Sequence, residues 1–114
     1  MQPVVITSCT NKKGYIAPPV LRARKVSKGV LTDVASEWRS RIESADPVDV
    51  PMRVYKGRAI REAEKAATIF GSKPYVISAG LGLVSPEKKI PAYDLTLART
   101  SEDCVFKRIT EPAT

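Results

Sequence analysis

A short apolar run, residues 75–77, leads directly into the small residues Ser78, Ala79, Gly80 and Gly82. The run follows the turn-forming residues 71–74, so it predicts a buried β-strand. Small residues at the carboxyl end of a strand let another backbone or a ligand come close. Ligands bind at this end of the strands in open α/β sheets. We therefore expect a site in the loop that begins at Ser78.

A second run of this kind opens the chain. Residues 3–8 are mostly β-branched and apolar, which predicts a first strand that is central and buried on both faces. Ser8, Cys9, Lys12 and Lys13 follow it, and their hydroxyl, thiol and ammonium groups could hold an anion, although an ordinary solvent loop is the alternative. Parallel strands end at the same edge of a sheet, so we expect the loops 8–13 and 78–84 to be neighbours.

Helical spacing of apolar residues appears twice, between residues 30 and 42 and between residues 59 and 70. Trp38 lies on the first apolar stripe, which favours a place in the core over a role in stacking on a ligand. Ser27 is a candidate N-cap for the first helix, and Gly71 ends the second.

The order of these elements predicts the fold class. Residues 48–55 alternate loosely, so a short strand stays open, with Pro51 arguing for an edge strand or none. The whole pattern predicts one α/β domain over residues 1–114, Rossmann-like, in two or three layers, with a short, mostly parallel sheet and two main helices. The weak pattern after residue 95 suggests a domain truncated before a final element, or a protein partner that covers the sheet.

Charge is concentrated near the N-terminus. The chain has 19 basic and 12 acidic residues, a net charge of +7. Residues 10–32 contain six basic residues and no acid, a pattern that attracts phosphates, with a solvated basic surface as the alternative. Within it, residues 14–28 form a basic loop in which Pro18 and Pro19 disfavour helix, so we expect an extended, mobile segment.

Several classes of protein are excluded or disfavoured by composition. The chain has no histidine and two cysteines, so a disulfide framework, a zinc site within one chain and every Ser-His-Asp or Cys-His arrangement are not expected. No apolar run approaches the roughly 20 residues of a membrane span. The first residues lack a charged region and a cleavage signal, so we expect a cytoplasmic protein. We also expect no cofactor.

Three segments carry a resemblance to a known family: Ser8-Cys9 followed by Lys12-Lys13, residues 54–57 before a helix, and residues 77–94 with glycines and Pro-x-Tyr-Asp at set spacing. On these residues the chain resembles the YaaA-like family, known for a peroxide-stress protein, and its smaller relatives. The resemblance implies a cytoplasmic α/β protein with a basic cleft and a link to DNA or nucleotides. Lys56, where the family usually has threonine, departs from the pattern.

Our first functional hypothesis is a domain that handles nucleic acid or a nucleotide. Lys12, Lys13 and Arg58 would hold phosphate. Tyr55 or Tyr93 would stack on a base or hydrogen-bond to it.

Two residues are candidates for catalysis if the domain is an enzyme of base modification or glycosidic-bond chemistry. Asp94 would act as a general base or electrostatic stabiliser, although its carboxylate could equally cap a turn. Cys9 would act as a nucleophile beside Lys12. The alternatives are a DNA- or RNA-binding module without catalysis and an interaction domain of a larger assembly or homo-oligomer.

Overall fold

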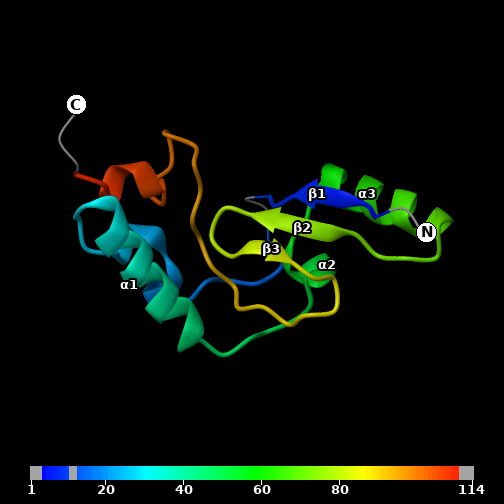
Figure 1. The fold of residues 1–114 in the computed structure, drawn as a ribbon, viewed down its shortest axis with the longest axis horizontal. Coiled ribbons are helices and arrows are strands. Elements are labelled where there is room, and N and C mark those ends of the chain that lie inside the picture. Colours follow the sequence, from blue (N-terminus) through cyan, green and yellow to red (C-terminus); the bar gives the residue numbers. More distant parts are fainter. Residues whose placement is uncertain (1–3, 11–12, 111–114) are drawn as a thin grey trace.

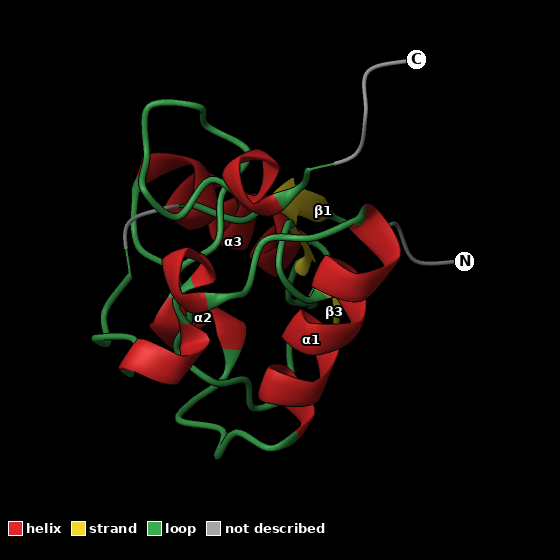
Figure 2. Ribbon diagram, turned by 90° about the vertical axis from the view of Figure 1, so that its left-hand side faces the viewer, coloured by secondary structure: helices red, strands yellow, loops and turns green. Residues whose placement is uncertain are grey.

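The protein is described here by a computed structural model that covers residues 4–10 and 13–110 (Figures 1 and 2). In these residues, three α-helices and three strands form an α/β domain with one mixed sheet. The elements are β1 (Ile6–Ser8), the 3-10 helices η1 (Pro19–Leu21) and η2 (Ala23–Lys25), α1 (Leu31–Glu43), α2 (Pro51–Val54), α3 (Arg58–Ile69), β2 (Tyr75–Ser78), β3 (Gly82–Val84) and the 3-10 helix η3 (Val105–Arg108).

The sheet has the order β1-β2-β3. β1 and β2 are parallel, with Ser8 opposite Ile77, as the two apolar runs predict. β3 is antiparallel to β2, with Gly82 opposite Ser78, so the expectation of a mostly parallel sheet and of a loop throughout residues 78–84 is wrong. The chain reverses within this short segment because Gly82 takes a φ of 78°, a left-handed conformation that other residues rarely adopt.

One face of the sheet is open. α3 lies against β1, while Val76 and Val84 point into the core. On the opposite face Ile6, Ile77 and Leu83 are 55%, 54% and 64% exposed. β1 is therefore an edge strand with an exposed apolar face, and the prediction of a central strand buried on both faces is wrong.

A second lobe forms around α1, beside the end of the sheet (Figure 1). The basic segment 14–28 belongs to it: η1 and η2 bury Leu21, Ala23 and Val26 against α1 and the C-terminal residues. The expectation of an extended loop is wrong because apolar residues within this segment supply part of the core. Pro19 is compatible with helix because it occupies the first turn of η1, where its missing N–H costs nothing.

The helices agree with the sequence pattern in part. α3 begins and ends within one residue of the predicted stretch 59–70, with Gly71 at a φ of 69° after it. α1 begins at Leu31, and Val30 rather than Ser27 occupies its N-cap. Residues 51–54 form α2, a third helix where a strand was left open, and Pro51 starts it. Over the described ranges, no helix has the length and apolar character that a membrane crossing needs.

Candidate functional site

The carboxyl ends of β1 and β2 meet at one edge of the sheet. The Cys9 N–H donates to the Ile77 carbonyl oxygen at 2.9 Å, and the Ala79 N–H donates to the Cys9 sulfur at 3.5 Å. The predicted adjacency of the two loops is thereby confirmed for their described residues. Asn11 and Lys12 lie outside the described residues, so the predicted role of Lys12 has no structural account.

Three hydroxyl groups form a buried chain next to this edge. Tyr93 Oη is hydrogen-bonded to Ser78 Oγ and, at 2.6 Å, to Tyr55 Oη. Ser78 Oγ also accepts the N–H groups of Gly80 at 3.2 Å and Leu81 at 3.0 Å. A hydroxyl oxygen has two lone pairs, so Ser78 donates its proton to Tyr93. We call Ser78, Tyr93 and Tyr55 the hydroxyl cluster.

The hydroxyl cluster is dry and neutral. Both tyrosines are fully buried, and Ser78 is 4% exposed. Burial raises the pKa of Tyr93 and the pKa of Tyr55, because the phenolate form would lose its hydration. Neither phenol is therefore a base that could take the Ser78 proton. The cluster can position groups and donate hydrogen bonds, but it does not activate Ser78 as a nucleophile.

Lys13 places a cation over this cluster. Lys13 pairs with Tyr55 in an antiparallel bridge, and its ammonium nitrogen lies 4.8 Å from the Tyr93 ring centre and 5.8 Å from that of Tyr55. The ammonium donates to the Thr10 carbonyl at 3.1 Å. Burial lowers the pKa of Lys13, and the charge of Asp94 opposes this shift. Among the described residues, no carboxylate lies within ion-pair distance of Lys13.

Gly80 and Gly82 are each required in the loop for a different physical reason. A Cβ on Gly80 would lie 2.7 Å from Cε2 of Tyr93 and 3.4 Å from the Trp38 ring, so Gly80 is needed for close packing. The Trp38 indole N–H also donates to the Gly80 carbonyl at 2.8 Å. Gly82 has no neighbour within 4 Å at its Cβ position and is needed for its φ. Neither glycine position contacts α3.

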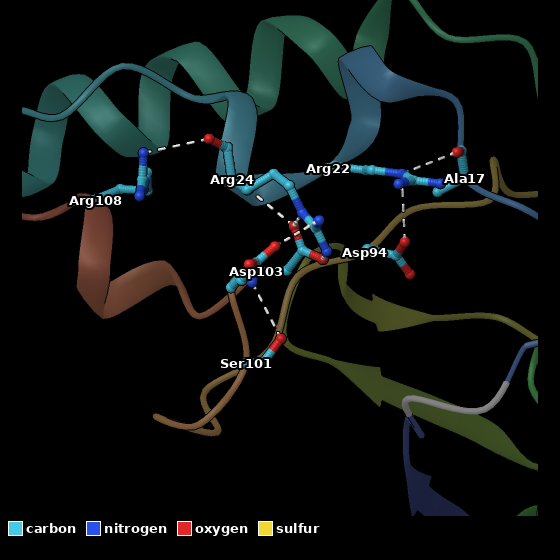
Figure 3. Close-up of polar contacts among 8 residues, drawn as sticks. Ala17, Arg22, Arg24, Asp94, Ser101, Asp103 and Arg108 are labelled. Carbon is cyan, nitrogen blue, oxygen red and sulfur yellow. Dashed lines mark hydrogen bonds and ion pairs between the residues drawn. The ribbon is translucent and has the colours of Figure 1, made fainter.

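The basic segment is partly neutralised by acids from the C-terminal quarter of the chain (Figure 3). Arg24 donates twice to the Asp103 carboxylate, at 3.0 and 2.9 Å, and lies 2.7 Å from Glu102. Arg22 Nε lies 3.8 Å from Asp94. Burial would raise the pKa of Asp103, but the hydrogen bonds from Arg24 outweigh it and hold that pKa below its usual value.

We call these side chains the arginine network: Arg22, Arg24, Asp94, Glu102 and Asp103. Two of the six basic residues of the predicted patch thus bind acids of the same chain. Asp94 was predicted either to act in catalysis or to cap a turn. In the structure its carboxylate faces the Arg22 guanidinium, and its backbone pairs with that of residue 22.

The structure brings together six of the predicted site residues and separates others. Arg58 opens α3 with a side chain that is 90% exposed and pairs with Glu62. Ser8 lies on the open face of the sheet. Asp94 acts on Lys13 through its charge but belongs to the arginine network. The residues brought together at the strand ends are Cys9, Lys13, Tyr55, Ser78, Gly80 and Tyr93.

Lys56 is a neighbour that the functional reading of the sequence missed. Its carbonyl accepts the Thr10 hydroxyl at 2.6 Å, and its side-chain nitrogen lies 3.5 Å from the Cβ position of Gly14. Lys56 follows Tyr55 directly, so its position beside the loop after β1 could have been found once Tyr55 was chosen.

Comparison with known proteins adds nothing to this geometry: no family model, no curated protein and no solved structure matches the chain. Within residues 4–10 and 13–110, no group of three or more Cys, Asp or Glu side chains is placed to hold a metal ion. Fold and site together define an α/β domain with a lysine over a tyrosine–serine cluster at the ends of two parallel strands.

Proposed function

We propose that this domain binds a phosphate-bearing ligand, a nucleotide or single-stranded nucleic acid, at the ends of β1 and β2. The observation that carries the proposal is Lys13, a half-buried cation that is not paired with a described carboxylate and lies over two aromatic rings. A desolvated ammonium gains more from an anion than a hydrated one does. The Rossmann-like character of the fold, the resemblance to the YaaA-like family and a cytoplasmic location belong to the same proposal.

Recognition comes from side chains rather than from a glycine-rich backbone cradle. The N–H groups of Gly80 and Leu81 donate to Ser78 Oγ, and that of Ala79 donates to Cys9. These donors are therefore occupied within the loop. Lys13 and the neighbouring Lys56 supply the positive charge.

Binding is supported better than catalysis. Asp94 faces Arg22, and the proton of Ser78 points to a neutral phenol. Catalysis through Cys9 or Asp94, in base modification or glycosidic-bond chemistry, remains a separate hypothesis. Turnover of nucleosides that is lost in Cys9→Ser or Asp94→Asn would support it. If the parent protein turns over no nucleoside, only the binding function is retained.

The test is a salt titration with a labelled 12-residue DNA single strand and, separately, with AMP. Lys13→Met should weaken both and reduce the log–log salt slope for the strand by about 0.7, the value for one lost phosphate contact. Lys65→Met is the matched control, because Lys65 is an exposed lysine on α3 away from the loops. Equal slopes in the two variants would contradict the proposal.

A further inference from the structure

A groove lies along α1, and Trp38 and Gly80 are among the residues that line it, whereas Lys13 is not. The groove has a volume of about 680 Å³, within the roughly 300–1,000 Å³ of small-molecule sites. Helix α1 forms one wall, and the turn from β2 into β3 forms the other. The walls are mostly apolar and include Val26, Val34, Trp38, Leu81, Ile90 and Leu95.

The rim of the groove is basic. Arg39 comes from α1, Lys88 and Lys89 follow β3, and Arg108 ends η3, while Glu43 is the acid among the lining residues. In the part of the chain that the structure describes, Arg39, Lys88 and Lys89 form no ion pair. The rim therefore favours an anion over a neutral or cationic ligand.

Arg108 lines one end of the groove. Gly29, just before α1, donates to the Arg108 carbonyl at 2.9 Å, so Arg108 lies at the N-terminal end of the helix. Its guanidinium donates to the Arg24 carbonyl at 3.2 Å, but Nε is buried and lacks a hydrogen-bond partner in the described ranges. A buried donor left unpaired is costly, and a small movement of the Arg108 side chain toward the groove that it lines would let an anion satisfy it.

We propose that this groove binds a small amphipathic carboxylate, with its apolar chain along α1 and its carboxylate at Arg108. The apolar walls suit a hydrocarbon body, and the basic rim suits one negative charge. A carboxylate also matches the planar donors of a guanidinium better than it matches an ammonium. The site is separate from the Lys13 site, and it does not depend on the proposed function.

Trp38 makes the test direct, because it lines the groove and is the single tryptophan of the chain. We expect octanoate, decanoate and dodecanoate, all below micelle formation, to change its fluorescence saturably. The Kd should fall about fourfold for each added methylene. Decanol should bind at least tenfold more weakly than decanoate, and decylamine should not saturate. Equal binding of decanoate, decanol and decylamine, or none by any of them, would overturn the proposal.

Variants separate the carboxylate site from general apolar binding. Arg108→Gln should weaken decanoate at least tenfold and leave decanol unchanged, whereas Lys107→Gln, which removes the same charge beside it, should change neither. Arg108→Lys keeps the charge but lacks the planar donors of the guanidinium. It replaces Arg108→Gln in the titration if Arg108→Gln does not fold. Ala35→Phe, an exposed position on the α1 wall, should block every ligand. Arg108→Gln and Lys107→Gln with the same decanoate affinity would refute the assignment of Arg108.

The same titration distinguishes the two proposals. Lys13→Met should leave decanoate binding unchanged, because Lys13 is not among the residues that line the groove. AMP should not compete with decanoate. Competition by AMP would show that the groove belongs to the nucleotide site and would overturn the carboxylate assignment, whereas decanoate binding without any AMP binding would contradict only the proposed function.

Discussion

The hydroxyl cluster and the arginine network meet at two adjacent residues, Tyr93 and Asp94. Tyr93 is fully buried and is hydrogen-bonded to Ser78 of β2. Asp94 instead faces Arg22 and is partly exposed (Figure 3). Successive side chains of an extended segment point to opposite sides, so one stretch of chain serves both regions. One region excludes water and keeps its groups neutral, and the other pairs charges near the surface.

Lys13 is instructive because it breaks this division. Arg22, Arg24 and Lys13 all lie in the basic stretch 10–32. The two arginines are paired with acids, but Lys13 lies over the buried hydroxyl cluster without such a pair. A charge held without a partner lowers stability or serves a ligand. The contrast suggests that Arg22 and Arg24 tie the segment 14–28 to the C-terminal quarter of the chain and that Lys13 binds the ligand.

The largest expected effect is on the dry side. Tyr93→Ala should cost about 3–5 kcal/mol of unfolding free energy, because it leaves a cavity between Trp38 and Tyr55 and removes the central hydroxyl. Urea unfolding at pH 7 measures it. Tyr75→Ala is the control, since Tyr75 is 36% exposed on the open face of the sheet, and it should cost about 1 kcal/mol or less.

The hydroxyl alone can be tested with a milder change. Tyr93→Phe keeps the ring but leaves Ser78 Oγ and Tyr55 Oη without their shared partner, at a cost of about 1–3 kcal/mol. If Tyr93→Phe unfolds at the same urea midpoint as the parent protein, the hydrogen bonds of the hydroxyl cluster contribute nothing to stability. The two regions then do not differ in the way proposed.

A smaller effect is expected in the arginine network. Asp103→Asn should cost on the order of 1–2 kcal/mol, because Asp103 is 6% exposed and accepts three hydrogen bonds from Arg24, while solvent screens the exposed guanidinium. Glu102→Gln is the control and should have no measurable effect, since the Glu102 side chain is 75% exposed. Equal unfolding midpoints for both variants would mean that burial of Asp103 does not matter.

The two regions should also lose their contributions to the unfolding free energy at opposite ends of the pH scale. The pKa of Asp103 is lower in the folded state, so its stabilisation is present above the unfolded value of about 3.9 and is lost as pH falls through the folded pKa. The pKa of Tyr93 is raised by burial, so its stabilisation is present below about pH 10 and is lost as pH rises further.

Urea midpoints measured from pH 3 to 11 check this prediction. Asp103→Asn should flatten the acid side only, and Tyr93→Phe should flatten the alkaline side only. Lys13 acts against the tyrosines, because its lowered pKa makes its contribution more favourable as pH rises through the folded pKa. An acid loss of unchanged size in Asp103→Asn would remove Asp103 as its cause.

The sequence predicted what depends on local pattern. The strand at residues 75–78, the periodic faces of α1 and α3, and the meeting of Cys9 with the Ser78 loop all follow from short stretches of sequence. β3 was missed because its three residues lie within a run of small and apolar residues that also suits a loop.

The contacts that define the two regions could not be predicted in this way. Arg24 and Asp103 are 79 residues apart, and Tyr55 and Tyr93 are 38 apart. No local periodicity links such pairs, since they meet only when distant parts of the chain fold together. The charge pattern of residues 10–32 therefore suggested a free basic patch, although acids from the C-terminal quarter neutralise part of it.

The smallest expected effect on stability is that of Lys13→Met. Removing the ammonium relieves the cost of burying a charge but loses the contacts with two rings and with the Thr10 carbonyl, so the net change should stay within about 1 kcal/mol. Anion affinity should nevertheless fall. Arg24→Met should show the reverse, with lower stability and unchanged affinity, because its charge is already paired with Asp103. Urea unfolding and strand binding on the same samples measure both quantities. If Lys13→Met loses stability and keeps its anion affinity, Lys13 has a structural role. The hydroxyl cluster with Lys13 and the arginine network then both serve only to stabilise the fold.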